Sequence, residues 1–272
     1  MGSKELFPAV FSRHAGAYAR RHDAIWRRGG DAARRRLLEA LGAGPGDRVA
    51  DLGCGPGDLG ARLRPTVGRA GLIVGVDLAP GMLAVARKRS PAALLLRGDL
   101  ERLPFKDACL DGAVSGHAFQ FVPDLGAALR EAARVLRPGG RLAASVPAGG
   151  EVGPGARLDA VFDALLPPAP SPTDRGPTLT TLADAGAWRE AVLEAGFASA
   201  AVEVVESSET YAGAAEMVSQ AAGWWSCAVR LEAVPRTHRA GLVERAAREL
   251  ERLLGAGPVS VARRAHVLVA DL

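Results

Sequence analysis

Short apolar runs alternate with amphipathic stretches through the first half of the chain. The runs are too apolar for strands with one solvated face, which is typical of parallel strands covered on both sides. This alternation predicts an α/β fold with a doubly wound, mostly parallel sheet. The expected strands cover residues 48–52, 71–76, 92–96, 110–115 and 140–146, and the expected helices cover 11–28, 31–42, 57–64, 80–89 and 124–136.

The pattern changes in the second half of the chain. Pro and Gly become frequent in one segment, and helical and strand patterns follow it. The Pro-rich segment covers 154–177, the helical patterns cover 182–195 and 211–254, and the strand patterns cover 200–205 and 260–271. We therefore expect helices inserted before a last strand.

A glycine turn follows the first expected strand, in the stretch VADLGCGPG at 49–57. Gly53, Gly55 and Gly57 stand at alternate positions, where glycine tolerates positive φ and leaves room for ligand atoms. The stretch predicts a tight strand-to-helix turn whose backbone amides face a cofactor that carries a nucleoside.

Two kinds of cofactor compete for this turn. Residues 55–60 satisfy the G-x-G-x-x-G dinucleotide fingerprint, with Asp77 at the distance of a ribose-binding acid. A pyrophosphate would be repelled by the carboxylate of Asp51, and Pro56 removes one amide donor. The carboxylate of Asp51 instead favours a cofactor with an amino-acid tail that carries ammonium and sulfonium charges.

Two more carboxylates stand at the ends of strand patterns. Asp77 ends the run LIVGVD, where its side chain either takes ribose hydroxyls or caps the helix that begins near Pro80. Asp99 follows the run at 92–96, where a carboxylate can accept a hydrogen bond from an adenine amino group. Three strand ends therefore offer one carboxylate each.

These motifs together resemble the class I S-adenosylmethionine (SAM)-dependent methyltransferases, particularly the small-molecule group of the ubiquinone/menaquinone-biosynthesis type. The resemblance covers about residues 45 to 150. It is carried by VADLGCGPG at 49–57, VGVDLAPGML at 74–83, GDLERLPF at 98–105 and AALREAARVLRPGGRLAASVP at 127–147. The ordered set is more specific than the glycine turn alone.

The resemblance implies a set of cofactor-binding residues. Asp51 and Gly53 would face the methionine part of SAM and Asp77 its ribose. Met82 would cover one face of the adenine, unless it belongs to the core. The remaining expected cofactor-binding residues are Gly55 and Gly57 of the turn, Leu78, Asp99 and Leu100 at the adenine edge, Ser115, and Tyr18 near the SAM carboxylate.

The resemblance also implies a domain plan. We expect a seven-stranded, Rossmann-like sheet that ends in an antiparallel hairpin, with N-terminal helices and a helical lid. Residues 1–44 would form an N-terminal helical cap, 45–205 and 257–272 the SAM-binding core, and 206–256 the lid inserted before the last strand.

The candidate catalytic residue is His117, which follows the fourth expected strand, where the family places groups that face the transferred methyl. An unperturbed histidine pKa near 6.5 suits proton removal at neutral pH. A histidine at a strand end is also often a hydrogen-bonded wall residue. The segment lacks Asn-Pro-Pro-Tyr, which disfavours methylation of amides and leaves hydroxyl, carbon or simple amine acceptors.

The candidate acceptor-binding residues are aromatic or lie in the N-terminal helix: His14, Phe119, Trp224 and Trp225, with the Pro-rich loop at 165–177 as a further wall. The alternative is that the tryptophans fill the seam between lid and sheet. Phe7, Phe11 and Trp26 are expected to pack the N-terminal helix onto the domain.

Composition excludes several other classes of protein. The net charge is +4, but lysine occupies only positions 4, 88 and 106, so nearly all basic residues are arginines, which are placed among acids in helical patterns. Aromatic residues make up only 5% of the chain, too few for the stacking platforms of nucleic-acid binders. RNA methylation is therefore a minor alternative.

The chain starts without the apolar core of a signal peptide and contains no apolar run of membrane-spanning length, so we expect a cytoplasmic protein. Its three cysteines form no C-x-x-C pair, which fits a reducing compartment and gives no support to a metal site.

The sequence therefore predicts a SAM-dependent methyltransferase, a monomer or homodimer, that acts on a small apolar, aromatic or quinone-like acceptor. One alternative is a related protein that keeps SAM as a scaffold and catalyses a cyclisation or serves as a binding module. An NAD(P)-dependent oxidoreductase is disfavoured by Asp51 and Pro56 and by the lack of a Tyr-x-x-x-Lys pair.

Overall fold

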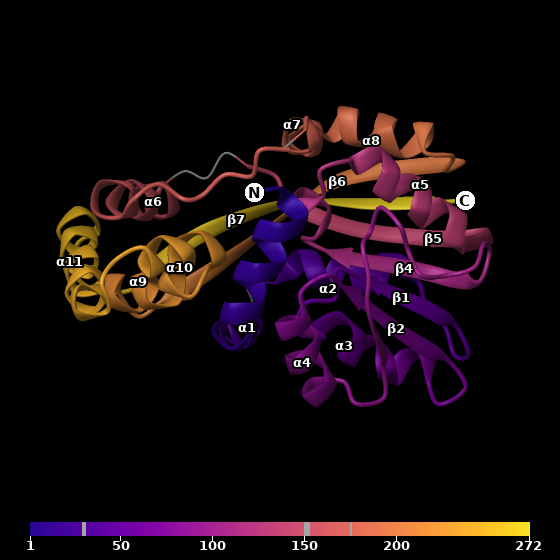
Figure 1. The fold of residues 1–272 in the computed structure, drawn as a ribbon, viewed down its shortest axis with the longest axis horizontal. Coiled ribbons are helices and arrows are strands. Elements are labelled where there is room, and N and C mark those ends of the chain that lie inside the picture. Colours follow the sequence, from indigo (N-terminus) through magenta and orange to yellow (C-terminus); the bar gives the residue numbers. More distant parts are fainter. Residues whose placement is uncertain (29–30, 150–152, 175) are drawn as a thin grey trace.

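The structure is a computed structural model that describes residues 1–28, 31–149, 153–174 and 176–272. Seven strands of these residues form one sheet in the order β3-β2-β1-β4-β5-β7-β6. Strands β1 to β5 pair in parallel, and β7 runs antiparallel to both β5 and β6 (Figure 1). The strands are β1 (Arg48–Leu52), β2 (Leu72–Asp77), β3 (Leu94–Arg97), β4 (Leu110–Gly116), β5 (Leu136–Pro147), β6 (Ser199–Tyr211) and β7 (Val259–Asp271).

Helices cover both faces of this sheet, because its strands are apolar on both sides. One face packs against α2 (Ala32–Leu41) and α3 (Asp58–Val67) through residues such as Leu37 and Ile73. The other packs against α5 (Leu125–Val135) and α8 (Ala185–Glu194), with Trp188 fully buried. The predicted doubly wound α/β fold is therefore confirmed.

The order of the strands reverses between β1 and β4. The turns after these two neighbouring strands lead to opposite sides of the sheet, which opens a crevice at their carboxyl ends. The glycine turn that follows β1 and His117 that follows β4 both lie at this position.

The hairpin of β6 and β7 is longer than predicted. The two strands stay paired from Ser199 opposite Asp271 to Tyr211 opposite Val259, so residues 206–211 continue the strand and the helices begin only at Ala214. A second difference is that the Pro-rich segment contains a helix, α6 (Pro154–Leu165). Pro154 occupies its first turn, where a missing N–H costs no hydrogen bond.

The helices between β6 and β7 share a separate core with α6. They are α9 (Ala214–Ala222), α10 (Trp225–Glu232) and α11 (Arg236–Leu254), and their contacts join Leu158 and Phe162 of α6 to Met217 and Leu250. Figure 1 shows this group, which we call the helical insertion, around the far ends of β6 and β7.

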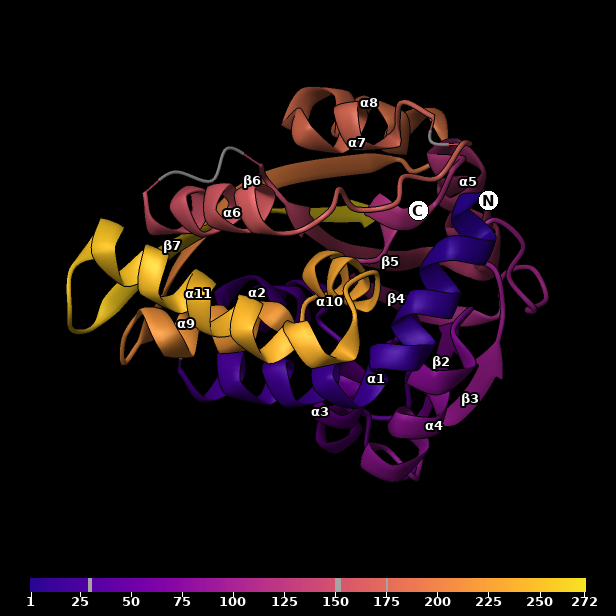
Figure 2. The ribbon, with the colours of Figure 1, turned by 60° about the vertical axis from the view of Figure 1, so that its left-hand side comes forward.

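The N-terminal helix α1 (Ser3–Arg27) bridges the two parts of the molecule. It packs on α4 (Pro80–Arg89) of the sheet domain and on α10 of the helical insertion, and Figure 2 shows it passing alongside both. A side chain at Gly81 of α4 would collide with the backbone of Ser12, so the two helices approach closely. The remaining helical segments of the described residues are helix α7 (Thr178–Ala183) and the 3-10 helix η1 (Phe119–Phe121). No helix in the described ranges is long and apolar enough to cross a bilayer.

Arg230 of α10 connects this helix to the C-terminal end of α6 inside the helical insertion. The guanidinium is 8% exposed and donates to the carbonyl oxygens of Phe162, Leu166 and Pro167 at 2.6 to 3.1 Å. It also pairs with Asp163 at 2.8 Å. These carbonyls lie at or just beyond the end of α6, where backbone acceptors run out of donors within the helix; that of Phe162 also accepts from the amide of Leu166.

We expect Arg230→Ala to lower the free energy of unfolding by about 3 kcal/mol, since buried carbonyls lose charged donors. Urea denaturation followed by circular dichroism measures the change. Arg236→Ala, at an exposed position of α11, is the matched control and should leave the midpoint unchanged. An unchanged midpoint for Arg230→Ala would show that α6 does not depend on this contact.

Candidate active site

The turn after β1 places three glycines, which have no side chains, at the crevice. Gly53, Gly55 and Gly57 have φ of 71°, 51° and 81°, the left-handed region that side chains rarely adopt. A Cβ on Gly53 would overlap the methyl group of Ala118, whereas a Cβ on Gly55 would meet nothing within 4 Å. The turn therefore contacts the loop after β4 at Gly53 and faces open space at Gly55.

Asp77 at the end of β2 is held by the same turn. One carboxylate oxygen accepts from the amide of Gly55 and the other from the amide of Ala79, each at 2.8 Å. Burial raises the pKa of Asp77, although these backbone donors act against the rise. Each carboxylate oxygen has lone pairs left, so capping and ligand binding are compatible.

Asp51 at the end of β1 is 1% exposed. One oxygen accepts from the amide of Gly60 at 3.1 Å, and the other is buried with no hydrogen-bond partner among the described residues. Burial raises the pKa of Asp51 to about 7, and the carboxylates of Asp77 and Asp58 add to this. Asp51 is not among the residues that line the two cavities of the site.

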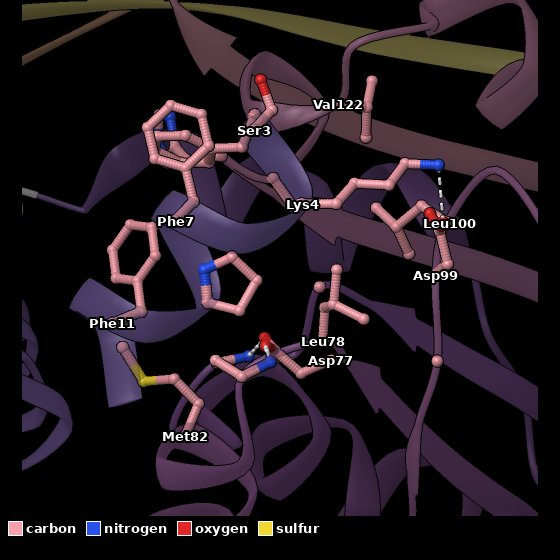
Figure 3. A pocket seen from close by; sticks show the side chains of 18 of the residues that line it. Ser3, Lys4, Phe7, Phe11, Asp77, Leu78, Met82, Asp99, Leu100 and Val122 are labelled. Carbon is pink, nitrogen blue, oxygen red and sulfur yellow. Dashed lines mark hydrogen bonds and ion pairs between the residues drawn. The ribbon is translucent and has the colours of Figure 1, made fainter. Parts of the chain in front are cut away.

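A cavity of about 120 Å³ opens beside this turn. Its floor includes Asp77, Leu78 and Met82, and Asp99 and Leu100 line another side (Figure 3). Helix α1 covers it with Ser3, Lys4, Phe7, Pro8, Phe11 and Tyr18. The ammonium of Lys4 lies 2.7 Å from Asp99 and 2.6 Å from Glu101, so an ion pair holds the start of α1 over the cavity.

A second cavity, of about 350 Å³, adjoins the first. Phe11, Tyr18, His117 and Phe121 line both, so these side chains form the junction. Trp224 and Trp225, together with residues of α6 and of the paired strands β6 and β7, form the far walls. The volume lies in the range of pockets that hold small organic molecules.

His117 stands at this junction in a constrained conformation. Its φ is 59°, and its amide donates to the carbonyl of Ser145 at 2.9 Å. The Nδ1 atom is buried without a hydrogen-bond partner within the described chain. Burial, helped by the charge of Arg34, holds the pKa of His117 well below 6.5, so the imidazole is neutral at pH 7.

These features fit SAM, the cofactor that the sequence predicts. The open direction at Gly55 leaves room for ligand atoms, and Asp77 presents a carboxylate to the cavity, whereas Asp51, also expected to bind the cofactor, is buried and does not line the cavity. The apolar side chains of Leu78, Met82 and Leu100 suit the faces and edge of a flat base.

Comparison with known proteins identifies the domain. Residues 50–144 match the family described as methyltransferase domain. These residues therefore form a methyltransferase domain. The family uses SAM as its cofactor, so the predicted resemblance and the predicted cofactor are confirmed.

Two curated relatives share the methyltransferase domain. A malonyl-[acyl-carrier protein] O-methyltransferase of Serratia marcescens is 39% identical over 150 residues, which cover 55% of this chain and 56% of that protein. A 2-phytyl-1,4-naphtoquinone methyltransferase of Synechococcus elongatus is 42% identical over 116 residues, which cover 40% and 50%. The match therefore spans about half the length of each relative.

The whole chain shares its fold with solved methyltransferases. A putative methyltransferase of Bacillus halodurans matches with a TM-score of 0.57 and 18% identity, over 89% of this chain and 99% of that one. The sheet and its helices are thus those of the methyltransferase fold.

The structure brings many of the expected binding residues of the methyltransferase domain together. Gly53, Gly55, Asp77, Leu78, Met82, Asp99, Leu100 and Tyr18 line the first cavity, His117 lines both cavities, and Trp224 and Trp225 line the second.

Other expected residues lie elsewhere. Ser115 is fully buried and its hydroxyl donates to Leu52, and Phe119 is fully buried in the core around α5 and α8. Gly57 packs against Ala86 of α4. His14 lies 2.9 Å from Glu232 of α10, in an ion pair if the ring is protonated.

The Pro-rich loop 165–177 meets the N-terminus. The carboxylate of Asp174 accepts from the amide and hydroxyl of Ser3 at 2.7 and 2.8 Å. Residue 175 of this loop lies outside the described residues. The loop therefore contacts the start of α1, which itself covers the first cavity.

Several residues of the two cavities were missed by sequence reasoning. Lys4 and Phe7 cover the first cavity, and Arg21 and His22 line the second. The spacing of Phe7 and Phe11 on one helical face was a signal, but it predicted packing on the domain. No local pattern marked Arg21 or Lys4, because their surroundings come from distant segments.

The ionisation of Asp51 predicts a pH-dependent stability. Its folded pKa of about 7 lies above the ordinary 3.8, so folded protein retains a proton that the unfolded chain releases as pH rises from about 4 to 7. Wild-type stability therefore loses this contribution across that window, whereas Asp51→Asn stays neutral. We expect the variant to gain stability relative to wild type, by on the order of 4 kcal/mol at pH 8.

Urea denaturation between pH 4 and pH 8 measures this difference. The exposed Glu251→Gln should show no comparable trend. A difference between Asp51→Asn and wild type that stays constant with pH would contradict the elevated pKa.

Proposed function

We propose that this protein transfers a methyl group from SAM to a small aromatic or quinone-like acceptor held in the second cavity. The observation that carries the proposal is the junction at His117, where a cavity that fits the cofactor meets a larger one with aromatic walls. A reacting pair must meet at such a junction, in an environment from which water is largely excluded.

SAM supplies an electrophilic methyl group when it is bound. In binding SAM, Asp77 would accept hydrogen bonds from the ribose hydroxyls. The negative charge of Asp51 would favour the cationic end of the cofactor. Helix α1 then closes the site, since Phe7 and Phe11 cover the first cavity and Phe11 also borders the second. Alignment of the two reactants supplies much of the acceleration.

His117 is the proposed proton acceptor. Its imidazole is neutral at pH 7 and its Nδ1 atom is free to accept from an acceptor hydroxyl or acidic carbon. The depressed pKa makes this base weak, so it serves acceptors whose own proton is acidic, as in hydroquinones and phenols. Such an assignment agrees with the naphtoquinone methyltransferase among the relatives.

The shape of the site supports a small acceptor rather than a nucleic acid. The second cavity is bounded by α1, by α10 and by the paired strands β6 and β7. We propose that the helical insertion, α6 and α9 to α11, acts with α1 as the lid of this cavity. The three cysteines are free thiols, which supports a reducing compartment such as the cytoplasm.

Calorimetry with SAM, S-adenosylhomocysteine (SAH) and NADH tests the cofactor assignment. We expect SAM and SAH to bind and NADH to give no signal. Asp77→Asn replaces an acceptor with a donor and should weaken SAH binding at least about tenfold, because hydrogen bonds to a charged acceptor contribute about 1.5–3 kcal/mol each. Binding of NADH, or SAH affinity in the variant within twofold of wild type, would refute the assignment.

The role of His117 is tested with a panel of hydroquinones, with release of SAH as the readout. His117→Asn should slow turnover by roughly 10²–10⁴-fold while SAH affinity stays within twofold. His238→Asn, at an exposed position of α11, is the control. Unchanged turnover in His117→Asn would show that His117 only lines the cavity. Consumption of an acceptor without release of SAH would show that the protein uses SAM as a scaffold and does not transfer its methyl group.

A further inference from the structure

One buried arginine in the second cavity has no partner that balances its charge. Arg21 of α1 is 7% exposed and lines this cavity. Its Nε atom is buried without a hydrogen-bond acceptor, and the guanidinium makes no ion pair or hydrogen bond within the described chain. Its contact is with the ring of Trp224, at 4.6 Å from the ring centroid.

The other buried arginines of the described residues, Arg34 and Arg230, have partners. Arg34 lies 3.0 and 3.1 Å from the carboxylate oxygens of Asp31, and Arg230 has Asp163 and three carbonyls. Arginine stays charged in proteins, and a buried charge without a partner carries a large desolvation cost. Arg21 therefore differs from these two arginines in lacking a hydrogen-bond or ion-pair partner, which suggests that a ligand supplies one.

The nearby acid does not fill this role. Glu209 is 1% exposed, and its carboxylate lies 3.7 Å from Arg28 and 3.6 Å from Arg263. Two other guanidiniums thus lie nearest its carboxylate, although Arg28 also pairs with Glu216. His22, which also lines the cavity, is kept neutral because burial lowers its pKa well below 6.5. The cavity is also lined by Asp31 and Asp159, and neither makes an ion pair with Arg21 within the described residues.

The wall beside Arg21 is aromatic. Trp224 stacks on Tyr18 with centroids 5.6 Å apart and an angle of 23°, and Tyr18 lies 4.3 Å from His22. Trp224 thus contacts both Tyr18 and Arg21 and also lines the cavity. Ring edges carry the positive end of the aromatic quadrupole and favour the face of another ring.

We propose that the acceptor is an aromatic acid whose carboxylate pairs with Arg21 while its ring packs against the aromatic wall. A guanidinium offers parallel donors that match both oxygens of a carboxylate. The proposal rests on the proposed function, because it names the substrate class of the same cavity. It adds that a neutral hydroquinone is a poorer ligand than an acid of the same shape.

Calorimetry with 1-naphthoate and 1-naphthamide tests this, with and without SAH. Wild type should bind the acid at least tenfold tighter than the amide. Arg21→Gln should bring the two affinities within about twofold while SAH affinity is unchanged, and Arg21→Lys should restore part of the preference. Arg20→Gln, at the neighbouring exposed position of α1, is the matched control.

Equal binding of the two probes by wild type would overturn the proposal, as would binding of neither, or a full preference in Arg21→Gln. If Arg21→Gln does not fold, the affinity ratio in wild type and Arg21→Lys decides. Failure of SAH to bind, together with a clear preference for naphthoate, would instead overturn the proposed function and leave an anion-binding cavity.

Discussion

The site depends on one close approach, between the turn after β1 and the loop after β4. Gly53 leaves no room for a side chain against Ala118, so these two loops meet directly where the order of the strands reverses. His117 precedes Ala118 and adopts a left-handed conformation, held by its bond to Ser145. The backbone contact thus sets where the imidazole stands relative to the glycine turn, and hence where the two cavities join.

Helix α1 couples both cavities to the helical insertion. It contributes Lys4 and Phe7 to the first cavity, Arg21 and His22 to the second, and Phe11 and Tyr18 to both. It also pairs with α10 through Arg13 and Glu232, at 2.8 Å. A movement of α1 would therefore open both cavities together, and the exposed ion pairs of Lys4 and Arg13 contribute little free energy against such a movement.

Local pattern was enough to predict the sheet domain, because its strands are apolar runs and its turn requires glycines at 53, 55 and 57. It was also enough to place Asp77 beside that turn, since both follow neighbouring strands. The helical insertion was predicted less well, because Pro154 starts a helix and residues 206–211 extend a strand only by pairing with β7. Lys4, Arg21 and His22 acquire their roles from segments far away in the chain, which no local pattern reports.

Four buried polar atoms in or beside the site lack a hydrogen-bond partner within the described residues: one oxygen of Asp51, Nδ1 of His117, Nδ1 of His22 and Nε of Arg21. Each costs folding free energy, because desolvation is not offset by a hydrogen bond. His117 lies at the junction of the two cavities, Arg21 and His22 line the second, and Asp51 lies at the end of β1 and lines neither. A stable domain carries such groups where ligands complete them, and ligands that bind only the folded state return stability in proportion to their affinity. In the proposed function, the acceptor would complete two of these groups, with an acidic proton at His117 and a carboxylate at Arg21.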